Sequence, residues 1–244
     1  MTGRHVELAV RARDLTLRSG GRDVLTGVDV DVPVGSMLVV RGRAGSGKTS
    51  LLLTLAGRMR PTSGTLRVLG HDLPAQARAV RRRAALAEVR GVNDLDDALT
   101  VEQHVAERLV LHQPWWRPWT GRGRVDELLD RVERTFDVPA APGAVPGAAA
   151  PGLHRREFVS DVDPLERMAL GVVLALVGRP DVLVVDDVDS LRRVEDRRRA
   201  WAALTALRRT SAAPLTVVAS CTDDPDLPRG ADADTVLLDL RDPR

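Results

Sequence analysis

The sequence predicts an α/β fold built around a largely parallel sheet. Short apolar stretches that suit buried strands alternate with longer stretches of helical periodicity over most of the chain. Hydrophobic residues make up 43% of the 244 positions, which is enough for a full-sized core in a chain of this length. These two observations together favour a globular α/β protein of one or two domains.

The first forty residues alternate apolar and polar positions, as strands with one buried face do. Glycine-containing turns over 19–23 and 33–35 separate the apolar runs. The predicted strands of this part cover residues 6–10, 15–17, 28–32 and 37–40. The last strand leads into a glycine-rich loop, and a buried helix is predicted from Thr49 to Gly57.

The rest of the chain carries the alternation of strands and helices. Residues 75–135 are predicted to be mainly helical, with Thr100 as the cap of one helix. Residues 139–152 are rich in proline, alanine and glycine, which predicts a loop or an internal linker. The other predicted elements are strands over 65–69, 182–185, 215–219 and 236–240 and helices over about 164–177 and 194–208.

Composition excludes several classes of protein. The net charge of +2 gives no electrostatic case for a nucleic-acid partner, so none is expected. The single cysteine, Cys221, excludes an internal disulfide framework and fits a reducing cytosol. No signal peptide is visible, and the longest proline-free apolar run, 168–177, is well short of the roughly 20 residues that a membrane helix needs. The composition therefore predicts a soluble, cytoplasmic chain.

Only one of the 36 basic residues is a lysine, Lys48, and the others are arginines. Lysine and tyrosine have AT-rich codons, so a GC-rich genome explains why the chain has one lysine and no tyrosine. A lysine that survives this bias indicates a position where arginine does not serve.

That lysine lies in a glycine-rich motif, because residues 42–49 satisfy the pattern G-x-x-x-x-G-K-[ST]. The glycines let successive N–H groups point at phosphate oxygens, and the following helix adds the positive end of its dipole. Lys48 would reach the β and γ phosphates, and Thr49 would bind Mg²⁺. The candidate cofactor-binding residues are Gly42, Arg43, Ala44, Gly45, Ser46, Gly47, Lys48, Thr49 and Ser50.

A second motif supports a P-loop NTPase core. The apolar strand over 182–185 delivers Asp186 to its C-terminal end, where ligands bind in open α/β sheets. A carboxylate there would hold Mg²⁺ together with Thr49. A guanine-binding N-K-x-D motif is missing, because Asn93 is the only asparagine. The two motifs therefore predict a bound nucleotide with Mg²⁺, with Thr49 and Asp186 as metal ligands.

The order of these elements resembles the nucleotide-binding domain of ATP-binding cassette (ABC) transporters over nearly the whole chain. The resemblance rests on the 138-residue spacing from Lys48 to Asp186, the segment Leu-Thr-Val-Glu at 99–102, and the ungapped stretch 166–187. It implies an ATP-binding subunit that binds Mg-ATP, hydrolyses it and drives or gates a separate transmembrane permease subunit.

The same resemblance implies how the chain is divided and where it works. It implies one ABC-type ATP-binding domain over 1–244, with a RecA-like parallel-sheet core, an N-terminal antiparallel β subdomain and an inserted α-helical subdomain. The core with the antiparallel part would cover 1–88 and 178–244, and the helical subdomain would cover 89–177. Two such subunits would form a homodimer or heterodimer, head to tail, peripheral to the cytoplasmic face of the cell membrane.

Two parts of the family's catalytic apparatus are altered. Asp187 stands where the family carries a catalytic glutamate, and its carboxylate could act as general base on water although it is one methylene shorter. The implied catalytic residues are Asp187 and Lys48. The family signature, Leu-Ser-Gly-Gly-Gln, aligns with the acidic Val-Asp-Pro-Leu-Glu at 162–166 or with 159–163, which retains Ser160.

Residues 162–166 have good chemistry for a helix start. Asp163 suits the N-cap, Pro164 the first helical position and Glu166 the third. The same segment is a poor phosphate-binding site, because a carboxylate would face the phosphate held by the other subunit and proline removes one N–H donor.

Three further family positions are altered. The family's glutamine falls on Glu88 or Val89. Its histidine falls on Cys221 or Thr222, and no aromatic residue stands at Ser19, where the family stacks a tyrosine on adenine. The pattern therefore predicts nucleotide binding with weak discrimination among bases and with weakened hydrolysis.

Two other functions stay open at this point. The altered positions also fit a nucleotide-binding regulator or degenerate subunit with little ATPase activity. A P-loop kinase acting on a small molecule would need a substrate pocket and lid arginines, and the 138-residue spacing argues against it.

Two groups of residues are given no site role. The tryptophans of one proline-rich span either pack locally or anchor a membrane-embedded partner. They are Trp115, Trp116 and Trp119. The histidines show no metal-ligand spacing and are assigned to surface or core. They are His5, His71, His104, His112 and His154.

Overall fold

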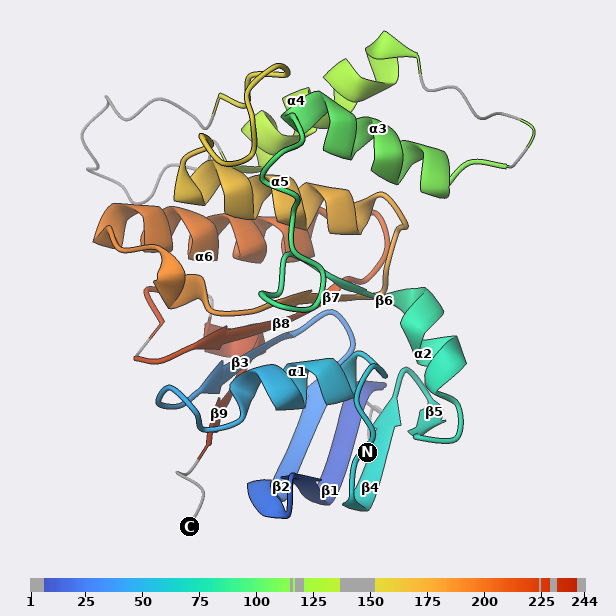
Figure 1. The fold of residues 1–244 in the computed structure, drawn as a ribbon. Helices are drawn as coiled ribbons and strands as arrows, with labels where there is room; N and C mark the ends of the chain where they lie inside the picture. Colours follow the sequence, from blue (N-terminus) through green and yellow to red (C-terminus); the bar gives the residue numbers. More distant parts are fainter. Residues whose placement is uncertain are drawn as a thin grey trace, which may run out of the picture.

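The computed structural model describes residues 7–114, 116, 121–136, 152–223, 225–228 and 232–240. Five features singled out from the sequence fall outside these residues wholly or in large part: Val6, His5, Trp115, Trp119 and the linker over 139–152. The described part is built in layers, with a group of helices, a parallel sheet, a single helix and an antiparallel sheet stacked in that order (Figure 1).

The antiparallel sheet forms from the alternating sequence at the start of the chain. Its strands, in the spatial order β2-β1-β4-β5, are β1 (Leu8–Ser19), β2 (Arg22–Pro33), β4 (Ser63–Val68) and β5 (His71–Leu73). The two predicted runs before residue 18 are one strand, β1, whose pairing with β2 shifts register around Asp14, a residue with φ of 47°. β5 was not predicted, because three residues are too few to show a periodic pattern.

The predicted parallel sheet is confirmed. Its strands, in the spatial order β6-β7-β8-β3-β9, are β6 (Ala84–Leu86), β7 (Val182–Val185), β8 (Thr216–Cys221), β3 (Met37–Arg41) and β9 (Thr235–Asp239). All of its pairs are parallel. The central strands are buried on both faces, as near-continuous apolar runs of this kind require.

Helices cover both faces of this sheet. They are α1 (Lys48–Leu55), α2 (Ala77–Arg83), α3 (Val101–Leu111), α4 (Arg122–Phe136), α5 (Pro164–Leu176) and α6 (Val194–Thr210). α5 and α6 lie on one face with α3 and α4 beyond them, and α1 lies on the other face, between the two sheets (Figure 1).

The side chains of β3 show how one strand serves two cores. Met37 and Val39 pack with the helical layers, whereas Leu38 and Val40 pack with α1 and the antiparallel sheet. Successive side chains of a strand point to opposite faces, so one apolar strand fills both hydrophobic clusters.

Within the stretch 75–135, which was predicted to be mainly helical with a strand over 84–89, residues 84–100 are not helical. This stretch contains β6 and then an irregular segment, residues 87–99, before α3 begins. Side chains in the segment bond to nearby backbone: Val89 N–H donates to Asn93 (3.0 Å) and Gly91 N–H donates to Asp94. Such local bonds compete with helical hydrogen bonds, so the polar residues stop the helix that the surrounding sequence favours.

Candidate functional site

The phosphate-loop motif and the acidic strand end meet at one edge of the parallel sheet. The loop follows β3, Ser220 is the penultimate residue of β8, and Asp186 follows β7. These three strands are neighbours in the sheet. A cleft of about 1060 Å³ opens at this edge. The predicted phosphate-loop, metal-binding and catalytic residues that line it are Ala44, Gly45, Lys48, Thr49, Asp186 and Asp187.

The remaining predicted loop residues are placed differently. Gly42 and Arg43 line a smaller hollow of about 330 Å³ on the side of β9. Ser46 is buried in the loop, and its hydroxyl has no hydrogen-bond partner within the described part of the chain. Ser50 belongs to the first turns of α1, where its carbonyl accepts from Thr54 at 2.7 Å.

The loop needs glycine at its end. Gly47 is the N-cap of α1 with φ of +88°, and a Cβ there would lie 2.8 Å from both the Val24 carbonyl oxygen and the Leu25 side chain. Gly45 has a similar φ of +83°, but a Cβ there would meet nothing within 4 Å. An alanine at Gly45 would therefore suffer backbone strain alone, whereas an alanine at Gly47 would suffer both backbone strain and steric clashes.

We expect Gly47→Ala to lower the free energy of unfolding by about 2–5 kcal/mol, because left-handed strain and overpacking add. Gly45→Ala should cost about 1–2 kcal/mol, since it carries the strain alone. Urea unfolding of both variants checks this. Equal costs for the two variants would contradict the steric account of Gly47.

The start of α1 leaves backbone donors available. Gly47 provides no side-chain cap, and the first turn contains no acidic residue. By contrast, Thr100 caps α3 with a full capping box and Asp163 caps α5. An uncapped helix start with the positive end of the helix dipole is a suitable place for phosphate oxygens.

Lys48 holds the loop from inside. Its Nζ donates to the Gly42 carbonyl at 2.5 Å and to the Arg43 carbonyl at 2.9 Å. An ammonium group has three donors, so one stays available for a phosphate oxygen while the other two hold the loop. The curled loop and its lysine thus form one preorganised cationic unit.

The oxygen atoms suited to a divalent cation are already together. Thr49 Oγ1 donates to Asp186 Oδ2 at 2.6 Å, and the buried Ser220 hydroxyl donates to Asp186 Oδ1. Ser220 also accepts from the Asp187 N–H at 2.8 Å. Ser220 is not among the site residues predicted from the sequence. Its position one residue beyond the predicted strand over 215–219, at the same sheet edge, was the available signal.

Asp187 combines a left-handed backbone conformation with a carboxyl group whose pKa is raised. Its φ of 50° places it in the left-handed region, which a non-glycine residue rarely adopts. Burial raises the pKa of its carboxyl group, and the charges of Asp186 and Asp189 raise that pKa further. Lys48 and Arg90 act in the opposite direction. A strained carboxylate with a raised pKa in a cleft is a candidate general base.

Comparison with known proteins decides the family. A family model described as ABC transporter matches residues 25–190, which is more than half of the chain. The chain belongs to the ABC transporter family. The daunorubicin resistance ATP-binding protein DrrA3 of Streptomyces coeruleorubidus is 30% identical over 190 residues, covering 78% of this chain and 54% of that protein.

Other ABC relatives give the same result at similar distance. The sulfate/thiosulfate import ATP-binding protein CysA of Mycolicibacterium paratuberculosis is 31% identical over 200 residues, covering 80% of this chain and 48% of that protein. The chain therefore spans about half the length of these curated relatives. Its relatives include both import and drug-resistance proteins.

The fold is also that of an ABC cassette. The dimeric structure of MJ0796, a bacterial ABC transporter cassette, matches with a TM-score of 0.68 at 14% identity and covers 96% of each chain. The structure of cbiO1 from Clostridium perfringens matches with a TM-score of 0.67 at 15% identity, covering 89% of this chain and 79% of that chain. The predicted P-loop NTPase fold is confirmed. In the described residues, no helix has the length and apolar character needed to span a membrane.

The position of the ABC family's glutamine is occupied by structural residues. Val89 is buried in the hydrophobic cluster beneath α1. The Glu88 carboxylate accepts from Arg167 of α5, with Nε at 2.8 Å and Nη2 at 2.5 Å. Arg167 also donates to Asp97 at 2.5 Å. Both candidate positions therefore serve the packing of the segment 87–99 in this structure.

The acidic segment at the signature position is a helix cap. Asp163 is the N-cap of α5 and accepts from the Leu165 N–H at 3.0 Å, with Pro164 at the first helical position. The Glu166 carboxylate accepts from the Gly152 N–H at 3.0 Å, and burial raises its pKa. Asp163 lines the cleft, so this wall of the cleft carries a carboxylate.

The histidine and tyrosine positions also differ from the family pattern. The buried Cys221 thiol has a pKa raised by burial to about 12, so it stays protonated at neutral pH. The Thr222 N–H donates to Asp189. Ser19 is exposed at the end of β1, and neither β1 nor β2 contains an aromatic residue. The described Trp116 is 65% exposed.

Proposed function

We propose that this ABC chain is the ATP-binding subunit of a transporter and that it binds Mg-ATP in the cleft at the edge of the parallel sheet. The observation that carries this proposal is the convergence of three groups there: the uncapped start of α1, the ammonium of Lys48, and the Thr49–Asp186 oxygen pair. These groups match the triphosphate and the hard divalent cation in charge and donor type.

Each residue has a proposed role. The loop amides from Gly42 to Ser50 bind phosphate oxygens, and Lys48 binds the β and γ phosphates. Thr49 and Asp186 hold Mg²⁺, which supplies charge neutralisation on the phosphates when bound. Asp187 accepts a proton from the attacking water, a role that its raised pKa and its place beside Lys48 support.

The proposed setting follows the family. The chain would work as one domain over 1–244, with a core over 1–88 and 178–244 and a helical subdomain over 89–177. It would dock on a separate transmembrane permease at the cytoplasmic face of the membrane. It would pair head to tail with a second ATP-binding subunit. Since Asp163 would bring a carboxylate to the other subunit's phosphate, a heterodimer with one productive site is favoured over a homodimer.

The test is nucleotide binding by the purified chain, followed by phosphate release with and without the permease encoded nearest to it. Mg-ATP should bind, and GTP should bind within a few-fold of ATP because no aromatic side chain is available at Ser19. Failure to bind any nucleotide would refute the proposal. A permease-dependent rise in phosphate release would support the transporter role.

A second candidate is a nucleotide-binding subunit with little turnover. Two observations favour it. The Glu88 carboxylate is bound by Arg167, and Asp163 places a carboxylate in the cleft. Binding without phosphate release, in the presence of permease and partner subunit, would select this candidate.

We expect Asp187→Asn to slow phosphate release by about 10²–10⁴-fold, the range for removal of a general base. The same change should raise the melting temperature at neutral pH. A raised pKa means that the folded protein binds the proton more tightly than the unfolded chain, so the ionised carboxylate destabilises the fold above that pKa. This cost is relieved as the pH falls through the folded-state pKa.

The matched control is Asp189→Asn, because Asp189 accepts the backbone N–H groups of Thr222 and Asp223. It should lower the melting temperature through weaker hydrogen bonds. Differential scanning fluorimetry from pH 5 to pH 8 checks both variants. A lower melting temperature for Asp187→Asn at neutral pH would contradict the assigned electrostatic cost.

A further inference from the structure

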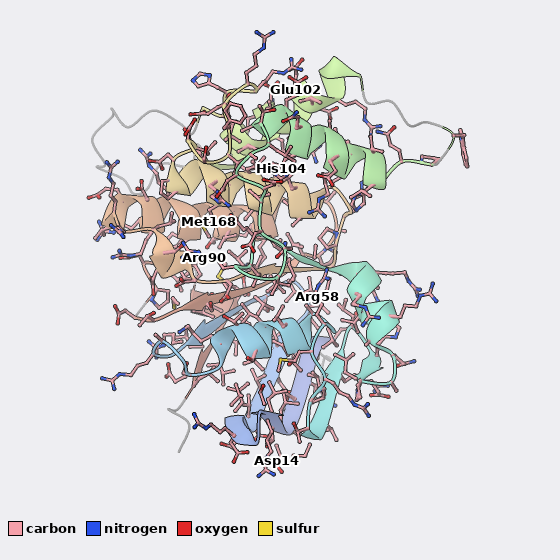
Figure 2. All side chains as sticks on the ribbon, viewed as in Figure 1. Asp14, Arg58, Arg90, Glu102, His104 and Met168 are labelled. Carbon is pink, nitrogen blue, oxygen red and sulfur yellow. The ribbon has the colours of Figure 1, made fainter. Side chains whose placement is uncertain are left out.

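The segment that follows β6 carries an arginine, Arg90, with no role among the residues predicted from the sequence. Arg90 comes four residues after the end of β6, which is the edge strand next to β7 in the parallel sheet. It lies where this segment passes between the helical layer and the sheet (Figure 2). Since β6 and β7 run in parallel, their C-terminal ends bring Arg90 and Asp187 to the same edge.

Arg90 is a cleft cation without a partner among the described residues. Its side chain is exposed in the cleft, and it makes no hydrogen bond or ion pair with any residue in the described part of the chain. Arg167 lines the same cleft but is held by Glu88 and Asp97. Lys48, Arg90 and Asp187 all line this one cleft, so their side chains face the same space.

The order of the strands places Asp187 between the two cations. Lys48 follows β3, Asp187 follows β7 and Arg90 follows β6, in the spatial order β6-β7-β8-β3. A triphosphate bound along the loop toward Asp187 would therefore extend its terminal phosphate from Lys48 toward Arg90. An arginine supplied by the same chain can neutralise charge on that phosphate, and its planar group can bind two phosphate oxygens.

Asp187 lies at the same sheet edge as Arg90, and both line the cleft. A terminal phosphate placed beside the Asp187 carboxylate meets a negative charge. A second positive charge beyond Lys48 would offset this repulsion.

We propose that Arg90 binds the terminal phosphate of the nucleotide from within the same chain and so selects triphosphate over diphosphate. This inference rests on the proposed nucleotide site.

The test compares Mg-ATP and Mg-ADP affinities by isothermal titration calorimetry. Arg90→Gln should weaken ATP binding on the order of 10-fold and change ADP binding less than about twofold, because ADP lacks the phosphate that Arg90 contacts. Arg90→Lys should recover part of the ATP affinity. Arg192→Gln is the matched control, since Arg192 lines the same cleft but lies outside the segment that follows β6, and it should leave both affinities unchanged.

The outcomes separate the two proposals. If the unmodified chain binds neither nucleotide, the proposed function fails and the inference fails with it. If the unmodified chain binds both, but Arg90→Gln weakens ATP and ADP equally or weakens neither, only the role of Arg90 is overturned. An equal ATP-specific loss in Arg192→Gln would overturn it as well, because the effect would then be general to cleft charge. A melting temperature within a few degrees of the unmodified chain confirms that Arg90→Gln folds.

Discussion

Lys48→Ala should weaken Mg-ATP binding at least about 100-fold. Lys48 is the only lysine in the chain. Its Nζ is positioned by two loop carbonyl oxygens, that of Gly42 at 2.5 Å and that of Arg43 at 2.9 Å. A hydrogen bond to a charged group contributes about 1.5–3 kcal/mol, so losing the phosphate contact together with the two bonds that shape the loop reaches this factor. Titration calorimetry with Mg-ATP measures it directly.

Lys48→Arg tests whether charge alone suffices. Arginine's planar fork cannot place one compact donor group against two carbonyls and a phosphate together, so we expect affinity to stay well below that of the unmodified chain. Arg22→Ala removes one exposed positive charge from the start of β2 and serves as the control for net charge. Unchanged ATP affinity in Lys48→Ala would show that the loop amides carry binding without the lysine.

Much of this site was predictable because its signals are local. The spacing of glycines around Lys48 and the apolar strand before Asp186 each fit within ten residues, and the parallel sheet then brings the two together. The capping of α5 by Asp163 was predictable for the same reason, since cap chemistry depends on adjacent residues.

The roles that could not be predicted depend on contacts between residues far apart in the sequence. Ser220 matters because β8 lies between β3 and β7, which no local pattern states. Arg167 lies 79 positions from Glu88, and its ion pair determines what Glu88 does. Arg90 follows a strand of only three residues, inside a stretch whose composition favours helix. Each of these roles is set by the packing of segments far apart in the chain.

The ion pair between Arg167 and Glu88 is expected to contribute strongly to the stability of the fold. Its guanidinium donates to both Glu88 oxygens and to Asp97, and it also donates to the Leu95 carbonyl at 3.2 Å. The side chains of Arg167 and Glu88 are 26% and 15% exposed. Glu88 raises the pKa of Arg167 above its ordinary value, so the pair stays charged across the accessible pH range.

We expect Arg167→Met to lower the free energy of unfolding by about 2–4 kcal/mol, because it leaves the largely buried Glu88 charge without a partner. The matched control is Arg83→Met, whose pair with Asp181 is 44% and 37% exposed and should be worth no more than about 1 kcal/mol. Urea unfolding measures both. The double variant Glu88→Gln, Arg167→Met should be more stable than Arg167→Met alone, since no uncompensated charge remains.

The same variants determine whether Glu88 belongs to the fold or to the nucleotide site. If Glu88 serves packing, Glu88→Gln costs stability and leaves Mg-ATP affinity within about twofold. If Glu88 instead acts in the position of the family's glutamine, the substitution changes nucleotide binding and leaves stability nearly untouched. The bonds to Arg167 favour the first result, because a carboxylate held by one guanidinium at two oxygens has little capacity left for a cation in the cleft. A cost of Arg167→Met no greater than that of Arg83→Met would reverse this assignment and return Glu88 to the site.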